Sequence, residues 1–77
     1  MQPLDTVPEG ENVRIIRIFG GMGFSQRLLE WGLVPGAVVQ VVFNRYGPVI
    51  IKVNDVTVAI GRGMANRILV ERLMKHG

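Results

Sequence analysis

Apolar and polar residues alternate over several short stretches of the chain, and this period-two pattern is typical of strands that bury one face. Valine and isoleucine dominate these stretches, as expected for strands. The pattern predicts five short strands, at residues 12–19, 37–43, 49–53, 56–60 and 68–73. The Ile15-Ile16 doublet interrupts the alternation in the first strand, so we expect a bulge or a change of face there.

Turn-forming residues separate the predicted strands. Asn54-Asp55 is the whole link between the third and fourth strands, and because both side chains tolerate a left-handed backbone, it predicts a two-residue β-hairpin. Pro35-Gly36 predicts a type II turn directly before the second strand, since proline presets φ at the first central position and glycine accepts a positive φ at the second. Residues 4–10, with their Pro and Gly, are predicted to form a loop.

One short helix is predicted after the first strand. Ser25 is expected to cap its N-terminus, Leu28 and Leu29 supply apolar positions within it, and Gly32 follows its end. Residues 64–67 have the length of a single helical turn, directly before the last strand.

These elements predict a mainly β fold: a small barrel of about five strands, with one short helix after the first strand and a helical turn before the last. A chain of 77 residues cannot build the two full sheets of a sandwich, and closure into a barrel would remove exposed edges. No repeat, low-complexity tract or linker divides the sequence. We therefore expect one domain over residues 1–77, with its core between about residues 4 and 73.

The sequence holds few side chains that could carry chemistry. It has no cysteine, and its single histidine, His76, lies near the C-terminus, so a metal cage of thiolates or histidines is excluded and no cofactor is predicted. The six acidic residues are dispersed, and Ser25, the only serine, lacks the Gly-x-Ser-x-Gly context of a nucleophile. Residues 20–23 (GGMG) lack the Lys-Ser/Thr ending of a phosphate-binding loop. We expect that the protein is not an enzyme and has neither catalytic nor metal-binding residues.

The net charge is +3 and the isoelectric point is near 10.2. The nine cationic residues are spread along the chain, which favours a solvated surface of mixed charge. A nucleic-acid-binding barrel of the translation-protein type remains the alternative, although only Arg45-Tyr46 sets a cation beside a ring that could stack on a base. No basic leader precedes an apolar block, and apolar stretches such as residues 33–44 are too short and broken to span a bilayer. A cytoplasmic location is expected.

Apolar side chains crowd the predicted helix. They are more numerous than one face of a two-turn helix can bury: Met22, Phe24, Leu28, Leu29, Trp31, Leu33 and Val34. Some should therefore stay exposed, and an exposed aromatic beside an arginine, here Trp31 and Arg27, is typical of protein-interaction surfaces. Alternatively, the helix covers an open end of the barrel and Trp31 fills the core. The surplus of apolar side chains would also allow the chain to form a homo-oligomer.

A set of motifs with fixed spacing runs from residue 4 to residue 70. The most specific is Arg27-Leu-x-x-x-Gly-Leu-x-Pro-Gly36, in which a helix, its glycine cap and a Pro-Gly turn follow one another. Supporting matches are Gly20-Gly21, Gly47-Pro48, Gly61-Arg62 and Ala65-Asn66-Arg67. In these motifs the chain resembles the FeoA family of small SH3-like barrel proteins and domains associated with ferrous iron transport.

The resemblance implies a cytoplasmic accessory or regulatory protein of FeoB, the membrane ferrous iron permease with a cytoplasmic GTP-binding domain. It implies a protein–protein contact without nucleic acid, with the membrane reached only through the partner. We expect the docking surface to contain Met22, Phe24, Arg27 and Trp31. The fold implied is also similar to the SH3-like C-terminal domain of iron-dependent repressors, although this chain has no helix-turn-helix. Because metal ligands are sparse, we expect the protein to modulate transport by contact and not to carry Fe²⁺.

Overall fold

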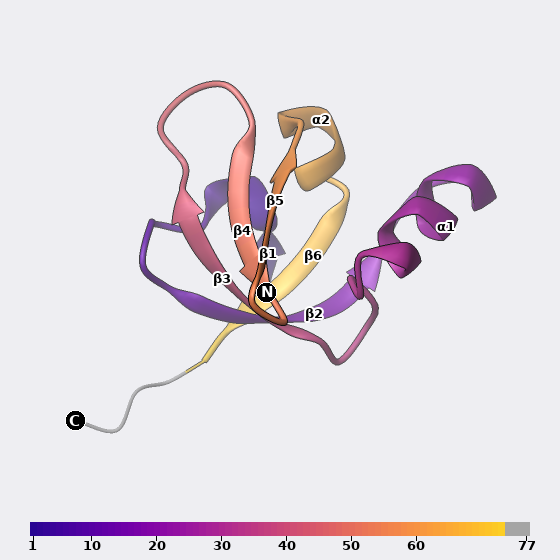
Figure 1. The fold of residues 1–77 in the computed structure, drawn as a ribbon, viewed down its shortest axis with the longest axis horizontal. Coiled ribbons are helices and arrows are strands. Elements are labelled where there is room, and N and C mark those ends of the chain that lie inside the picture. Colours follow the sequence, from indigo (N-terminus) through magenta and orange to yellow (C-terminus); the bar gives the residue numbers. More distant parts are fainter. Residues whose placement is uncertain (74–77) are drawn as a thin grey trace.

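One antiparallel sheet dominates the computed structural model, which describes residues 1–73 and, among these, every side chain except that of Met22. The strands lie in the order β1-β6-β2-β3-β4-β5. Along the chain the elements are β1 (Gln2–Pro3), the 3-10 turn η1 (Leu4–Thr6), β2 (Asn12–Ile18), α1 (Met22–Glu30), β3 (Val38–Phe43), β4 (Val49–Val53), β5 (Val56–Ile60), α2 (Arg62–Ala65) and β6 (Ile68–Arg72). Figure 1 shows that the sheet is strongly curved and that α1 projects from one side of it.

The predicted mainly β fold is confirmed, because all five predicted strands, the helix and the helical turn are present. The structure adds a sixth strand: Gln2 and Pro3 of β1 pair with β6, so the predicted loop at residues 4–10 is preceded by a strand and starts with a 3-10 turn. Burial explains why the N-terminal segment is structured. Leu4 and Val7 are fully buried and hold the N-terminal segment against the core.

Closure of the barrel was expected but is not observed in the described residues. The strand order is linear, and β1 and β5 are the two edges of the sheet. The curvature comes instead from bulges, which bend a strand and increase its twist. The register of β2 against β6 shifts between Ile15 and Arg17, which confirms the bulge predicted at Ile15-Ile16. A second shift lies between Val41 and Phe43 in β3.

The interior of the curved sheet is filled by apolar side chains. No polar or charged residue within residues 1–73 is buried. The buried residues are Leu4, Val7, Val13, Ile15, Leu28, Leu33, Val39, Val41, Val49, Ile51, Val53, Val58, Ile60, Ala65, Ile68 and Val70. On the strands they alternate with exposed positions, as the sequence pattern predicted. Each fully buried valine, leucine or isoleucine contributes about 1.5 to 3 kcal/mol, so this cluster is the main source of stability.

The turns follow the predicted backbone chemistry. Asn54 and Asp55 have φ values of 50° and 64°, as the two central residues of a type I′ turn require, so the predicted hairpin between β4 and β5 is confirmed. Gly36 has φ 95°, and the N–H of Ala37 donates to the carbonyl of Val34 at 2.9 Å, which confirms the turn at Pro35-Gly36. The predicted helical turn is present as α2, two residues earlier than expected.

Helix α1 begins earlier than predicted. Gly21 is its N-cap residue, and the N–H of Ser25 donates to the carbonyl of Gly21 at 3.2 Å. The prediction that Ser25 caps the helix is therefore wrong, since Ser25 lies inside it. Gly21 adopts the extended backbone of a cap residue (φ −78°, ψ 173°) without a side-chain hydrogen bond, and the helix starts at Met22, three residues before Ser25.

The end of α1 is fixed by two hydrogen bonds around Gly32, which has φ 79°. The N–H of Gly32 donates to Leu29 at 3.0 Å, and the N–H of Leu33 donates to Leu28 at 2.9 Å. This is the Schellman arrangement, and its usual apolar contact is supplied by Leu28 and Leu33, which are both in the core. The predicted role of Gly32 at the helix end is confirmed.

Asn44 links the loop after β3 to the N-terminal segment. Its side-chain Nδ2 donates to the carbonyl oxygens of Asp5 (2.9 Å) and Val7 (2.8 Å), and its backbone N–H donates to Oε2 of Glu9 (2.8 Å). These bonds join residues about 35 to 39 positions apart in sequence. Asn44 therefore joins the β3–β4 loop to the N-terminal segment by hydrogen bonds that belong to no strand pairing.

The glycine at the end of α1 should be sensitive to substitution. A Cβ at Gly32 would lie 3.1 Å from Nδ2 of Asn54 and would force an alanine into a positive φ, so we expect Gly32→Ala to lower the free energy of unfolding by about 1 to 2 kcal/mol. Gly23→Ala is the matched control, because no atom lies within 4 Å of its Cβ position and alanine favours a helix. Urea denaturation should show Gly23→Ala as neutral or stabilising. Equal losses in both variants would contradict this account.

Asn44→Asp should destabilise the fold more than a typical surface change. It replaces an amide that donates to two carbonyl oxygens by a carboxylate that repels them, so we expect a loss of about 2 to 3 kcal/mol in the free energy of unfolding. Gln40→Glu makes the same chemical change at an exposed position of β3 and should stay within about 0.5 kcal/mol of the parent protein. Thermal and urea denaturation would compare the two variants. A mild effect of Asn44→Asp would show that these bonds add little.

Candidate functional site

Helix α1 is the least buried element of the fold. Within it, only Leu28 is fully buried among the described side chains, and Phe24 packs partly against the core. The helix follows the end of β2 and lies beside the barrel instead of across the sheet (Figure 1). The barrel core therefore holds α1 chiefly through Leu28 and, beyond its end, Leu33, and most of its surface faces solvent.

Three of the four residues predicted to form the docking surface can be placed. Phe24 is half-buried, Arg27 is exposed and Trp31, the C-cap residue, is 36% exposed. Their spacing of three and four residues puts them on the same side of the helix. Met22 starts the helix, but its side chain lies outside the described part of the structure.

The expectation that part of the apolar surplus stays exposed is confirmed. Leu29 is 60% exposed and Trp31 is 36% exposed. The alternative, in which Trp31 fills the core, is wrong, because Trp31 is exposed and does not belong to the buried cluster. Around Leu29 the surface has a shallow depression of about 290 Å³, lined by Gly20, Ser25, Gln26 and Leu29.

Sequence reasoning missed that two phenylalanine rings near the start of α1 each have an arginine guanidinium over them. Phe19 is 48% exposed, and the guanidinium of Arg17 lies 5.1 Å from its ring centre. The guanidinium of Arg67 lies 5.9 Å from the ring of Phe24, and the N–H of Phe19 donates to the carbonyl of Arg67 at 2.8 Å. The ring of Phe24 also covers Gly20, where a Cβ would come within 2.6 Å of it. Phe19 was placed in the first strand by sequence, whereas β2 ends at Ile18 and leaves its ring outside the core.

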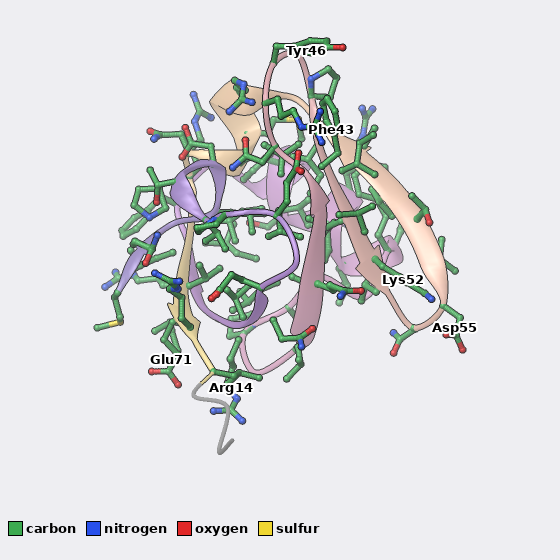
Figure 2. The ribbon with its side chains drawn as sticks, turned by 90° about the vertical axis from the view of Figure 1, so that its left-hand side faces the viewer. Arg14, Phe43, Tyr46, Lys52, Asp55 and Glu71 are labelled. Carbon is green, nitrogen blue, oxygen red and sulfur yellow. The ribbon has the colours of Figure 1, made fainter. Side chains whose placement is uncertain are left out.

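In the described part of the chain, some of the basic side chains form ion pairs with acidic side chains, and others do not. Among residues 1–73 there are four ion pairs: Arg14–Glu71 (3.3 Å), Arg45–Glu9 (3.2 Å), Lys52–Asp55 (3.9 Å) and Arg72–Glu11 (2.7 Å). Figure 2 shows the first and third of these pairs on separate parts of the barrel. As far as residues 1–73 are described, Arg17, Arg27, Arg62 and Arg67 form no ion pair with an acidic side chain. Two of these four are the arginines stacked on Phe19 and Phe24, and a third, Arg27, lies on α1 itself.

The described residues contain no group of three or more His, Asp or Glu side chains placed to hold a metal ion. Every buried polar side-chain atom in the same part of the chain has a hydrogen-bond partner. None of the helices in residues 1–73 is long and apolar enough to cross a membrane. His76 lies outside the described residues.

Comparison with known proteins identifies the family. The FeoA domain matches residues 2–72 of the chain. A putative Fe(2+) transport protein A of Methanocaldococcus jannaschii is 44% identical over 71 residues, which cover 92% of this chain and 87% of the relative. The crystal structure of an iron uptake regulatory protein (FeoA) superposes with a TM-score of 0.85 at 40% identity, covering 94% of this chain and 96% of that one.

A manganese-dependent transcriptional repressor is similar in fold alone. It superposes with a TM-score of 0.84 at 20% identity, covering 94% of this chain but 41% of the repressor. The predicted SH3-like barrel is thus confirmed by the solved structures of FeoA proteins. The match over residues 2–72 and the identity to an Fe(2+) transport protein A together show that this chain belongs to the FeoA family.

Proposed function

We propose that the chain is a cytoplasmic accessory protein of ferrous iron transport and that it acts by docking onto FeoB, the GTP-binding iron permease. The family and the names of its relatives support the transport role: one is a putative Fe(2+) transport protein A, and another is an iron uptake regulatory protein. The contact with FeoB is our inference from the resemblance, and the exposed helix α1 is the structural observation that carries it.

The proposed α1 docking face consists of Met22, Phe24, Arg27 and Trp31. Trp31 offers a large apolar ring, a third of it already exposed, that a partner could bury at little ordering cost, because Trp31 is the C-cap of a helix closed by hydrogen bonds. Arg27 has no ion pair in the described structure and can form one with an acidic side chain of the partner. An aromatic anchor beside an arginine is the usual composition of an interface hot spot.

The same features favour regulation by contact. The barrel is held by a wholly apolar core and so presents α1 on a rigid base. The full sequence has no cysteine and one histidine, and its carboxylates are dispersed, so it offers few ligands for Fe²⁺ in transit. In this proposal the protein biases the states of the permease, and Fe²⁺ passes through the partner.

The nucleic-acid alternative is less well supported by the geometry. The exposed ring of Tyr46 could stack on a base, but the neighbouring cation, Arg45, already pairs with Glu9 at 3.2 Å. Salt-titrated binding to mixed RNA tests this alternative directly. Micromolar affinity that weakens steeply between about 50 and 200 mM salt would support it.

The docking proposal can be tested by pull-down of full-length FeoB in detergent. Trp31→Ala should weaken retention by about 30-fold and Arg27→Ala by about tenfold, as expected when an interface anchor is truncated. Tyr46→Ala and Arg45→Ala are the matched controls, because they remove an exposed aromatic and an arginine from the β3–β4 loop, away from α1 (Figures 1 and 2). Both controls should retain FeoB as the parent protein does.

If Trp31→Ala and Arg27→Ala bind FeoB unchanged, the α1 docking face is wrong, while membership of the FeoA family is unaffected. If the two controls lose binding instead, the docking surface lies on the β3–β4 loop. If no variant and no parent protein binds FeoB, the proposed function itself fails.

A further inference from the structure

Strand β5 is an edge of the sheet. It pairs with β4 on one side, and no strand of the described chain pairs with its other side. Within residues 1–73, no backbone group of Val56–Ile60 forms a hydrogen bond with backbone outside the β4 ladder.

The hairpin turn determines which backbone groups face outward. In a hairpin with a two-residue turn, the flanking residues form a hydrogen-bonded pair, here Val53 and Val56. Such pairs recur at every second residue, so Val58 and Ile60 also direct their N–H and C=O groups to β4. Thr57 and Ala59 consequently point their N–H and C=O groups to the open side.

The two edges of the sheet differ in how well they are protected. Natural proteins protect edges with short strands, proline, charged side chains or bulges. The β1 edge has only two residues and one of them is Pro3. The β5 strand is five residues long, has the sequence VTVAI without charge or proline, and pairs in regular register along its whole length. Nothing in β5 therefore discourages a further strand from pairing with it.

We propose that β5 pairs with β5 of a second copy of this chain, antiparallel and centred on Val58. This register sets Thr57 of each copy opposite Ala59 of the other, and both residues direct their backbone groups outward. Each of these two residue pairs exchanges two N–H···O=C bonds, so four hydrogen bonds form across the two-fold axis. A register centred on Ala59 would need Gly61, whose carbonyl already accepts from Met64 and Ala65.

Charge complementarity favours a second copy as the occupant. In the Val58-centred register, the β4–β5 turn of one chain (residues 54 and 55) lies beyond the end of the paired strands, next to the start of α2 in the other chain. Asp55, whose side chain is 99% exposed, would then lie close to Arg62 of the second copy. Arg62 forms no ion pair with an acidic side chain of its own chain in the described structure. Val56, 57% exposed, would meet Ile60 of the second copy and lose exposure.

Amide hydrogen exchange tests this pairing and does not depend on FeoB. Comparing samples from about 20 μM to about 1 mM, we expect exchange at Thr57 and Ala59 to slow by about tenfold or more as dimers form. Val56, Val58 and Ile60 already donate to β4, so their exchange should change little. Sedimentation over the same range should show a mass approaching twice that of one 8.5 kDa chain.

Two variants place the dimer contact on β5. Ala59→Pro removes only an outward-facing N–H, so it should keep the β4 ladder and raise the dimer dissociation constant by about tenfold or more. The double change Thr57→Lys and Ala59→Lys sets like charges opposite each other across the two-fold axis and should also weaken the dimer. Gln40→Lys with Val42→Lys adds the same charge at exposed positions of β3, which is paired on both sides, and should leave the dimer intact.

A chain that stays monomeric throughout this range overturns the proposal, even if an added extended peptide protects Thr57 and Ala59. So does a dimer that survives both β5 variants with unchanged affinity. Neither result bears on the α1 docking face, because that face is tested by FeoB retention alone.

Discussion

The structure depends on one constraint: a chain of this size, without disulfides, must enclose a single apolar core with one sheet. The two bulges bend β2 and β3 enough for the sheet to surround that core, and the result is an interior without any buried polar residue among residues 1–73. Asn44 ties the N-terminal segment to the far side of the sheet by side-chain hydrogen bonds, where strand pairing is absent. Bending and tethering together replace the closure that a longer sheet would achieve by strand pairing.

The same constraint accounts for the position of α1. The sheet already fills its own interior, so there is room for only a few helix residues in the core, and Leu28 and Leu33 take it. The remaining apolar residues of the segment are left near the surface, together with arginines that have no acidic partner in the described chain. Because the core has little room for this segment, its excess apolar side chains form a potential contact surface. That surface is built on a helix whose end is fixed by backbone hydrogen bonds, so it is preorganised.

Features that depend on a few neighbouring residues could be predicted from the sequence. The Asn54-Asp55 hairpin, the turn at Gly36 and the glycine at the end of α1 follow from backbone preferences of two or three residues, and all three are confirmed. Features set by distant contacts could not. Strand β1 exists because β6 provides its partner 66 to 68 residues away, and the exposed ring of Phe19 reflects where β2 leaves the core. The cap at Gly21 was missed because glycine gives no side-chain signal there.

The amide of Asn54 lies beside Gly32, so the tip of the β4–β5 hairpin touches the segment that ends α1. Asn54 lies in the type I′ turn with φ 50°, and a shift of the hairpin would change the space available at the helix end. This contact joins the hairpin that contains β5 to the end of α1, so it lies between the two candidate surfaces. If a ligand at one surface moves this contact and so changes the affinity of the other surface for its partner, thermodynamic reciprocity requires that partner to change the ligand's affinity by the same factor.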